Sequence, residues 1–125
     1  MSTPDPVILV VEDEDLLRQA AVALVEDAGF EAVAAASADE ALAILEARTD
    51  VRLVFTDIQL PGSMDGLKLA HAVRNRWPPV ELILTSGRRH IGPDDLPERG
   101  RFFAKPYDFT ALSQAFQEMA ANDRR

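Results

Sequence analysis

Polar residues that could do chemistry follow four of the apolar runs in this chain. Glu12-Asp13 and Asp57 supply carboxylates, Ser86 a hydroxyl and Lys105 an ammonium group. Three carboxylates brought together repel one another unless a cation lies among them. Oxygen ligands without His or Cys suit a hard ion such as Mg²⁺. We therefore predict a magnesium site made of Glu12, Asp13 and Asp57.

A carboxylate beside a divalent ion can also act as a nucleophile. It can attack a phosphoryl group and form an acyl phosphate. The metal ion and the Lys105 ammonium would neutralise charge on the phosphoryl oxygens, and Ser86 could donate a hydrogen bond to the product. Each residue also has an ordinary role, since acids favour helix N-termini and Ser-Gly pairs favour turns. Their joint occurrence at four strand ends favours the phosphoryl chemistry.

The elements that must position these residues are strands alternating with helices. Apolar β-branched runs indicate buried strands, and apolar residues at helical spacing indicate helices. This arrangement implies a parallel sheet covered on both faces, with ligands at the carboxyl ends of its strands. The first and last helices have apolar faces that include Leu16, Leu17 and Phe109. We expect strands over residues 7–11, 30–35, 51–56, 80–85 and 101–104, and helices bounded by Leu16 and Gly29, opened by Ser37–Glu40, and spanning 67–76 and 109–121.

Composition limits the classes of protein to which the chain can belong. It has 125 residues, 47% hydrophobic and 27% charged, which is typical of one globular domain. We predict a single domain over residues 1–125 with a core of about 7–120. A net charge of −8 disfavours nucleic acid binding. The sequence has no Cys, no signal peptide and no membrane-length apolar run, so we expect a cytoplasmic protein that does not bind membranes.

Four motifs in order make the chain similar to the receiver domain of bacterial two-component response regulators. They are Ile8–Glu14, Thr56–Gly66, Thr85–Gly87 and Lys105–Pro106, and the resemblance covers about residues 7–120. It implies a flavodoxin-like, doubly wound α/β fold with a five-stranded parallel sheet in the order 2-1-3-4-5. It also implies a signalling phosphoacceptor rather than an enzyme. Such a domain takes its phosphoryl group from a histidine kinase or phosphotransfer protein with Mg²⁺, and signals to an output partner, which the sequence does not identify.

The resemblance assigns roles to the acidic residues and to the lysine. Asp57 matches the aspartate that accepts the phosphoryl group. Glu12 and Asp13 match the acidic metal-binding positions, and the backbone carbonyl of Gln59 matches a further metal ligand. Lys105 matches the lysine that pairs with the phosphoryl oxygens.

The resemblance also identifies the residues of a conformational switch. Ser86 matches the switch hydroxyl because the small Gly87 follows it, and Thr85 is the competing position. Phe102 matches the switch aromatic. Pro106 matches the proline that follows the lysine, typically after a cis peptide bond. Phosphorylation is expected to draw the hydroxyl toward the phosphoryl group and to shift the aromatic.

The segment before the fifth strand departs from the family pattern. Residues 88–101 contain Gly92, Pro93, Pro97 and Gly100, whereas a regular helix needs about ten uninterrupted residues. We predict a short or missing fourth helix, with residues 88–100 forming a mobile loop of at most one helical turn. Dimerisation through a regular fourth helix is then disfavoured, and we expect a monomer or weak dimer.

Other functions fit the sequence less well than that of a phosphoacceptor. A metal-dependent aspartyl phosphatase of the haloacid dehalogenase type needs a second Asp where this chain has Gln59. An FMN-binding flavodoxin needs a Ser/Thr/Gly phosphate loop where residues 12–14 are acidic. A degenerate receiver would lack Asp57, Asp13 or Lys105. The chain could also be a receiver cut from a hybrid histidine kinase, although its start at Met1 and its short tail favour a stand-alone protein.

Overall fold

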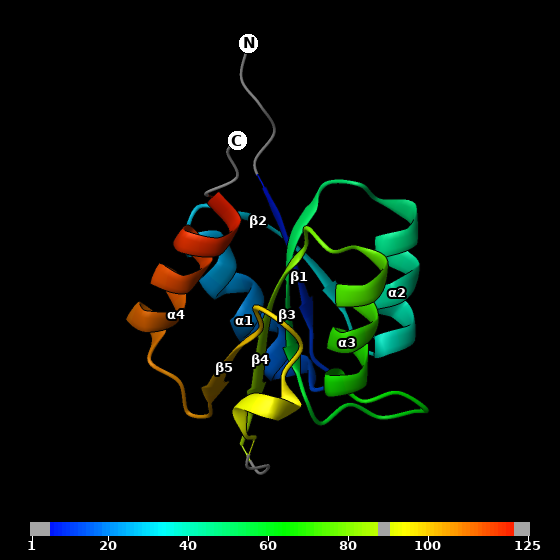
Figure 1. The fold of residues 1–125 in the computed structure, drawn as a ribbon. Helices are drawn as coiled ribbons and strands as arrows, with labels where there is room; N and C mark the ends of the chain where they lie inside the picture. The colour runs from blue at the N-terminus through cyan, green and yellow to red at the C-terminus, as the bar shows by residue number, and fades with distance from the viewer. Residues whose placement is uncertain (1–5, 88–90, 122–125) are drawn as a thin grey trace.

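A five-stranded parallel sheet forms the centre of the molecule (Figure 1). The computed structural model describes residues 6–87 and 91–121. The strand order is β2-β1-β3-β4-β5, with every pair parallel, which confirms the predicted flavodoxin-like order. The strands are β1 (Val7–Val11), β2 (Glu31–Ala35), β3 (Val51–Asp57), β4 (Glu81–Ser86) and β5 (Arg101–Ala104).

Helices cover both faces of the sheet, as the alternation of strands and helices predicts. One face packs against α1 and α4, through side chains such as Val25 and Phe116. The opposite face packs against α2 and α3, through side chains such as Leu45 and Leu69. The helices are α1 (Asp15–Asp27), α2 (Ala38–Ala47), α3 (Gly66–Arg76) and α4 (Phe109–Phe116), which continues as the π-helical turn η2 (Gln117–Ala121).

Polar side chains fix where three of these helices begin. Ser37 accepts a hydrogen bond from the Glu40 backbone N–H and so caps α2, while Glu40 accepts the Ala36 N–H instead of the Ser37 N–H that a full capping box requires. Asp65 and Asp108 accept backbone N–H groups in the first turns of α3 and α4. These caps fix the start of α3 at Gly66, after the loop that follows β3, and the start of α4 at Phe109, after β5.

Three apolar residues predicted on helix faces are exposed. Leu16 is 77%, Leu17 42% and Phe109 65% exposed, whereas Leu112 and Phe116 of α4 are buried. Helical spacing locates the apolar stripe of a helix, but it does not show where the sheet beneath that helix ends. All three exposed residues lie in the first turn of their helices, at the rim where the parallel strands stop, so the sheet does not cover them.

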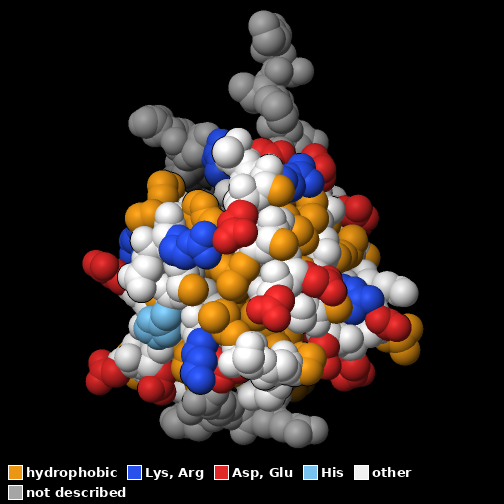
Figure 2. Space-filling model, turned by 90° about the vertical axis from the view of Figure 1, so that its right-hand side faces the viewer, with side chains coloured by type: hydrophobic (Ala, Val, Ile, Leu, Met, Phe, Trp, Pro, Cys, Tyr) orange, Lys and Arg blue, Asp and Glu red, His pale blue; other side chains and the backbone are white. Residues whose placement is uncertain are grey.

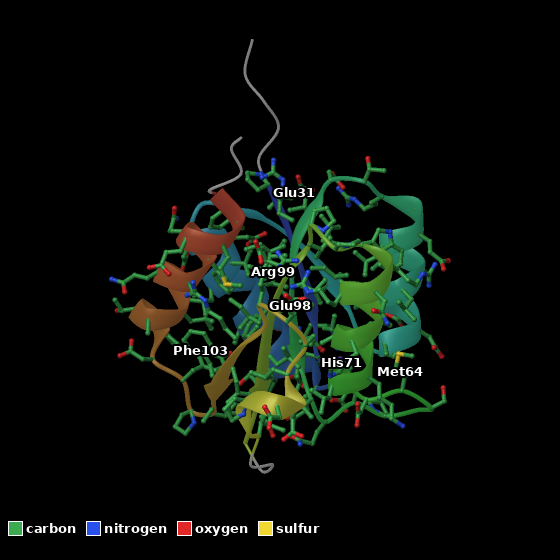
Figure 3. All side chains as sticks on the ribbon, viewed as in Figure 1. Glu31, Met64, His71, Glu98, Arg99 and Phe103 are labelled. Carbon is green, nitrogen blue, oxygen red and sulfur yellow. The ribbon has the colours of Figure 1, made fainter. Side chains whose placement is uncertain are left out.

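The segment between β4 and β5 forms no α-helix among its described residues, 91–100. It contains one 3₁₀ turn, η1 (Pro93–Asp95), which confirms the prediction of a short or missing fourth helix. Residues 88–90 of the predicted loop lie outside the described residues. His71 and Arg74 of α3 bond the backbone carbonyls of Asp95 and Glu98 in this segment at 2.9 and 2.8 Å. Figure 3 labels His71 on α3 and Glu98 in the segment. The mobility of the loop stays a prediction, and these contacts favour a segment held against α3.

No helix in the described ranges combines the length and apolar character of a membrane span. Figure 2 shows the side of the molecule where α2 and α3 lie, on which apolar side chains are interspersed with acidic and basic ones. Half-buried residues such as Leu42 and Trp77 pack here against the core beneath.

Candidate functional site

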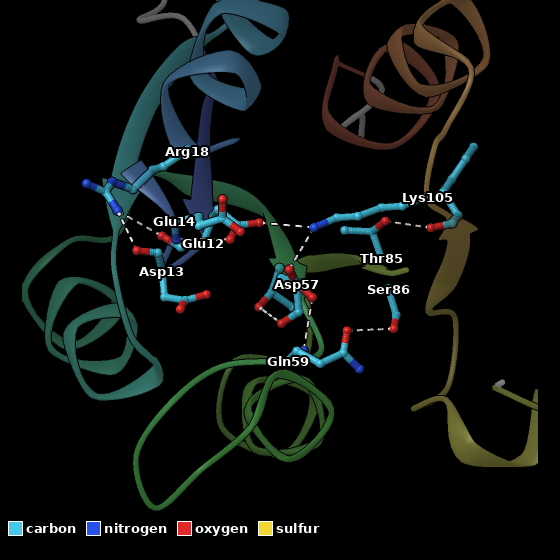
Figure 4. A network of polar contacts seen from close by, with 11 residues as sticks. Glu12, Asp13, Glu14, Arg18, Asp57, Gln59, Thr85, Ser86 and Lys105 are labelled. Atoms are coloured by element: carbon cyan, nitrogen blue, oxygen red, sulfur yellow. Dashed lines mark hydrogen bonds and ion pairs between the residues drawn. The ribbon is translucent and has the colours of Figure 1, made fainter. Parts of the chain in front are cut away.

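The carboxyl ends of four strands meet at one rim of the sheet. Asp57 is the last residue of β3 and Ser86 the last of β4, while Glu12 and Lys105 directly follow β1 and β5. Because β1 and β4 both pair with β3 in parallel, the carboxyl ends of β1 and β4 lie on either side of the end of β3. Figure 4 shows Glu12 and Lys105 approaching Asp57 from opposite sides.

Lys105 joins the two buried carboxylates. Its Nζ lies 2.8 Å from Asp57 Oδ2 and 3.3 Å from Glu12 Oε1. The side chains of Glu12 and Asp57 are only 8% and 7% exposed, so without a cation they would repel each other at low dielectric. Burial lowers the pKa of Lys105, but the hydrogen bond and charge of Asp57, with those of Glu12, outweigh it and raise that pKa above its usual value. The ammonium therefore stays charged.

The surroundings of Glu12 disfavour its charged form. Burial is the largest influence and raises the pKa of Glu12, and the neighbouring charge of Asp57 acts in the same direction. The backbone N–H of Glu14, which donates to Glu12 Oε2 at 3.1 Å, and the Lys105 ammonium oppose this shift without cancelling it. The two oxygens of Glu12 thus have the Lys105 ammonium and the backbone at the start of α1 as their partners.

Both carboxylate oxygens of Asp57 are engaged. Oδ1 accepts the backbone N–H of Gln59 at 2.9 Å, and Oδ2 accepts Lys105. The Asp57 backbone is fixed as well, since the Thr56 hydroxyl donates to its carbonyl at 2.9 Å. The Gly66 backbone N–H donates to the Ile58 carbonyl at 2.9 Å, which brings the start of α3 against the end of β3. These contacts orient the carboxylate before any ligand binds.

The predicted metal ligands do not form a cluster of three carboxylates. No group of three or more acidic, His or Cys side chains in the described part of the chain is arranged to hold a metal ion. Glu12 faces Lys105 instead, and the exposed Asp13 stands at the edge of the site (Figure 4). Mg²⁺ commonly takes one or two carboxylates, with waters and phosphate oxygens completing its shell. The carboxylates of Asp13 and Asp57 and the carbonyl of Gln59 fit that requirement.

The two hydroxyls at the end of β4 have different partners. Thr85 Oγ1 donates to the Phe103 backbone carbonyl of β5 at 2.6 Å, so this hydroxyl links β4 to β5. Ser86 Oγ donates to Gln59 Oε1 at 2.8 Å, on the side of Asp57 (Figure 4). This contrast favours Ser86 over Thr85 as the hydroxyl that serves the site.

The remaining predicted residues lie on and after β5. Phe102 is half-buried and packs toward α2 and α3, while Phe103 packs toward α1 and α4. The peptide bond between Lys105 and Pro106 is cis. Phe102 thus contacts the core face on which the β4–β5 segment lies.

A cavity beside the site was not foreseen from the sequence. It has a volume of about 390 Å³. Three charged residues of the site line it, Glu12, Asp57 and Lys105, together with apolar side chains of α1 and α4 that include Leu17 and Phe109. The available signal was the apolar first turn of two helices that begin at the same rim. These first turns extend beyond the sheet, so Leu17 and Phe109 lie at the rim, where the Phe109 ring meets the Tyr107 ring at 6.0 Å between centroids.

Known proteins resemble this chain over most of its length. A family model described as the response regulator receiver domain matches residues 8–117. The putative response regulator NtrX-like of Rickettsia bellii is 40% identical over 85 residues, which are 67% of this chain and 18% of that protein. The sensor kinase CckA of Brucella abortus is 33% identical over 116 residues, which are 90% of this chain and 12% of that protein. The chain thus spans less than a fifth of either relative.

Solved structures agree with the sequence matches. The crystal structure of the response regulator protein TrrA from Thermotoga maritima, in complex with Mg²⁺ and BeF, has a TM-score of 0.80 and 25% identity, and the match covers 91% of this chain and 98% of that one. Because the family model covers nearly all of the sheet and its helices, and the strand order agrees with it, this chain belongs to the response regulator receiver domain family, the phosphoacceptor domain of two-component signalling.

Proposed function

We propose that Asp57 accepts a phosphoryl group from the phosphohistidine of a histidine kinase or phosphotransfer protein. The observation that carries this proposal is the pairing of the buried Asp57 carboxylate with the Lys105 ammonium, 2.8 Å apart at the carboxyl ends of β3 and β5. A carboxylate fixed beside a permanent cation is prepared to carry the added negative charge of a phosphoryl group. The family membership of the chain supports the same role.

The reaction is a phosphoryl transfer between two side chains. An Asp57 carboxylate oxygen attacks phosphorus, and a new O–P bond forms as the N–P bond of the phosphohistidine breaks. The electron pair of that bond returns to the imidazole, which takes up a proton from solvent. Lys105 moves its hydrogen bond from the carboxylate to a phosphoryl oxygen, and the Gln59 backbone N–H keeps the carboxyl group oriented. The product is an acyl phosphate on Asp57.

Asp13, Asp57 and the Gln59 carbonyl are the residues we propose as the holders of Mg²⁺, with Glu12 at the edge of the set. When bound, the ion would neutralise the phosphoryl oxygens and lower the repulsion between donor and site. All donors are oxygens, which suits this ion. The Mg²⁺–BeF complex of the similar protein TrrA supports this assignment.

Ser86, Phe102 and Pro106 form the proposed path from the site to the surface. Ser86 would donate to a phosphoryl oxygen, and Phe102 would adjust on the α2–α3 face of the sheet. Pro106, after Lys105, fixes how β5 leads into α4. A phosphorylated site could in this way alter the surface that an output partner reads.

The protein that donates the phosphoryl group must reach Asp57 past the cavity beside it. Leu16, Leu17 and Phe109 are the exposed large hydrophobic residues of the described chain, and Leu17 and Phe109 line that cavity. Apolar side chains grouped at one rim suit contact with a partner protein. We place the docking of the phosphohistidine-bearing partner there.

The wider context of the chain is also part of the proposal. We propose one receiver domain over residues 1–125, with a core of about 7–120, acting in the cytoplasm as a monomer or weak dimer. The net charge of −8 supports the view that it does not bind nucleic acid by itself. The match to a sensor kinase leaves a receiver of a hybrid kinase as the second arrangement, besides a stand-alone protein.

Incubation with acetyl phosphate and Mg²⁺, followed by intact mass measurement, tests the proposal. We expect one added phosphoryl group, which does not appear when a chelator of Mg²⁺ is present from the start or when Asp57 is replaced in Asp57→Asn. The matched control is Asp39→Asn, which changes an exposed aspartate at the start of α2 and should leave uptake unchanged. Uptake by Asp57→Asn at the normal rate would overturn the assignment. Multiple turnover of a phosphate monoester would favour a phosphatase instead.

A further inference from the structure

Gln59 connects the phosphoacceptor to the buried hydroxyl of Ser86. Its backbone N–H donates to Asp57 Oδ1 at 2.9 Å, while its side-chain Oε1 accepts the Ser86 hydroxyl at 2.8 Å (Figure 4). Ser86 itself is only 2% exposed. One residue in the β3–α3 segment therefore contacts both groups that a phosphoryl group on Asp57 would have to bring together.

The Ser86 hydroxyl has a single proton to donate. In this structure that proton goes to Gln59 Oε1. A phosphoryl group on Asp57 would offer three strong acceptor oxygens nearby. Ser86 can donate to one of them only by leaving Gln59, so the amide oxygen and the phosphoryl group compete for the same proton.

We infer that the Gln59 side chain is a latch, a positioning residue that holds Ser86 in the unphosphorylated arrangement. The latch sets what fraction of phosphorylated molecules complete the conformational change, because it stabilises only the unswitched state. This inference rests on the proposed phosphoacceptor role of Asp57. The family resemblance implies a role only for the backbone carbonyl of Gln59, whereas the latch depends on its side chain.

The size of the effect follows from the bond that is lost. A neutral hydrogen bond of ordinary strength changes an equilibrium by about two- to tenfold. Removing the Gln59 acceptor should therefore raise the ratio of switched to unswitched phosphorylated molecules by about that factor. Glu at this position keeps an acceptor oxygen, and a carboxylate accepts more strongly than an amide, so the ratio should then be at or below the wild-type value.

The test uses the full chain with acetyl phosphate and Mg²⁺. Intact mass gives the phosphorylated fraction, and the NMR amide signals of β5, which is distant in sequence from the substitutions, give the switched fraction among phosphorylated molecules. The variants are Gln59→Met, which keeps the length but not the acceptor, Gln59→Glu, Ser86→Ala and the double variant Gln59→Met/Ser86→Ala. We expect Gln59→Met to raise the ratio in the wild-type background and to have no effect once Ser86 is Ala.

The outcomes separate the latch from the function on which it rests. An unchanged ratio in phosphorylated Gln59→Met would overturn the latch alone, as would an equal rise in the Ser86→Ala background, since Gln59 would then act by another route. Absence of phosphoryl uptake by every protein, the wild type included, would overturn the phosphoacceptor role and the latch with it.

Discussion

The backbone of Gly66 packs directly against the carbonyl of Asp57. A Cβ at position 66 would overlap that carbonyl oxygen and lie 2.8 Å from its carbon and 2.9 Å from the Ile58 Cα. These neighbours are backbone atoms of the last residue of β3 and of the residue after it, and they cannot turn aside as a flexible side chain would. The first residue of α3 must therefore be glycine for Asp57 to keep its position.

We expect Gly66→Ala to lower both stability and phosphoryl uptake. Overpacking of this kind costs about 1–3 kcal/mol, and relief of the clash must move either α3 or the Asp57 backbone. Urea unfolding and intact mass after incubation with acetyl phosphate measure the two effects. Gly92→Ala is the matched control, because its Cβ would meet nothing closer than 3.7 Å. Equal stability of the two variants would contradict the steric argument.

The convergence of Glu12, Asp57 and Lys105 could be predicted because it depends on strand order alone. Each residue follows an apolar run, and parallel strands bring their carboxyl ends to one rim. What those side chains do once they meet could not be predicted in the same way. Glu12 faces Lys105 instead of joining a cluster of carboxylates, since burial makes an ammonium partner more favourable than a further negative charge.

Side-chain hydrogen bonds between elements were the least predictable part of the site. The sequence left Thr85 and Ser86 as competing hydroxyls because a shift of one residue along a strand exchanges their faces. The register of β3 with β4 and the acceptors at Phe103 and Gln59 distinguish them. Neither acceptor is marked by a motif, since each depends on how two strand ends are placed in space.

Neutralising Glu12 should stabilise the protein at neutral pH. Burial raises the pKa of Glu12, so the folded state favours its neutral form. Stability is therefore lost as pH rises from the ordinary glutamate pKa, about 4.3, toward the raised value in the folded protein. Glu12→Gln stays neutral and can still accept the Glu14 N–H, so it should gain on the order of 1 kcal/mol at pH 7 and little at pH 4.

Urea unfolding of both proteins at the two pH values measures this difference. Glu14→Gln is the matched control, since Glu14 is exposed and its neutralisation should leave the pH dependence close to that of the wild type. A Glu12→Gln protein less stable than the wild type at pH 7 would mean that the ion pair with Lys105 outweighs the effect of burial.

Arg74 should be the main anchor of the segment between β4 and β5. Its Nε donates to the Glu98 carbonyl of that segment at 2.8 Å. Its Nη1 donates to the carbonyls of Pro78 and Val80, just before β4, at 2.6 and 2.8 Å, so Arg74 ties the segment to that part of the chain. Hydrogen bonds from a charged donor contribute about 1.5–3 kcal/mol each when buried and less when partly exposed. We expect Arg74→Met to lose about 1–3 kcal/mol of stability and to speed amide exchange across residues 91–100.

Hydrogen exchange followed by mass spectrometry reads the segment directly. The control is Arg76→Met on the same helix, because Arg76 pairs with Glu46 at the surface and such pairs contribute about 0–1 kcal/mol. Exchange across 91–100 that is already fast in the wild type, and unchanged in Arg74→Met, would favour the mobile loop predicted from the glycines and prolines over the anchored segment.

The exposed apolar residues beside Asp57 should matter for a protein donor and not for a small one. Leu17 and Phe109 line the cavity next to the carboxylate, and neither side chain contacts the reacting groups in the proposed mechanism. Docking of a phosphohistidine-bearing partner would bury them, and burial of one such side chain contributes roughly 1.5–3 kcal/mol. Leu17→Ser and Phe109→Ser should therefore slow transfer from a phosphorylated kinase or phosphotransfer protein by about ten- to a hundredfold at subsaturating concentrations.

Uptake from acetyl phosphate should stay near the wild-type rate, because that donor needs no apolar surface. An equal loss with both donors would mean that the substitutions disturb Asp57 itself, and no loss with either would remove this rim as the docking site.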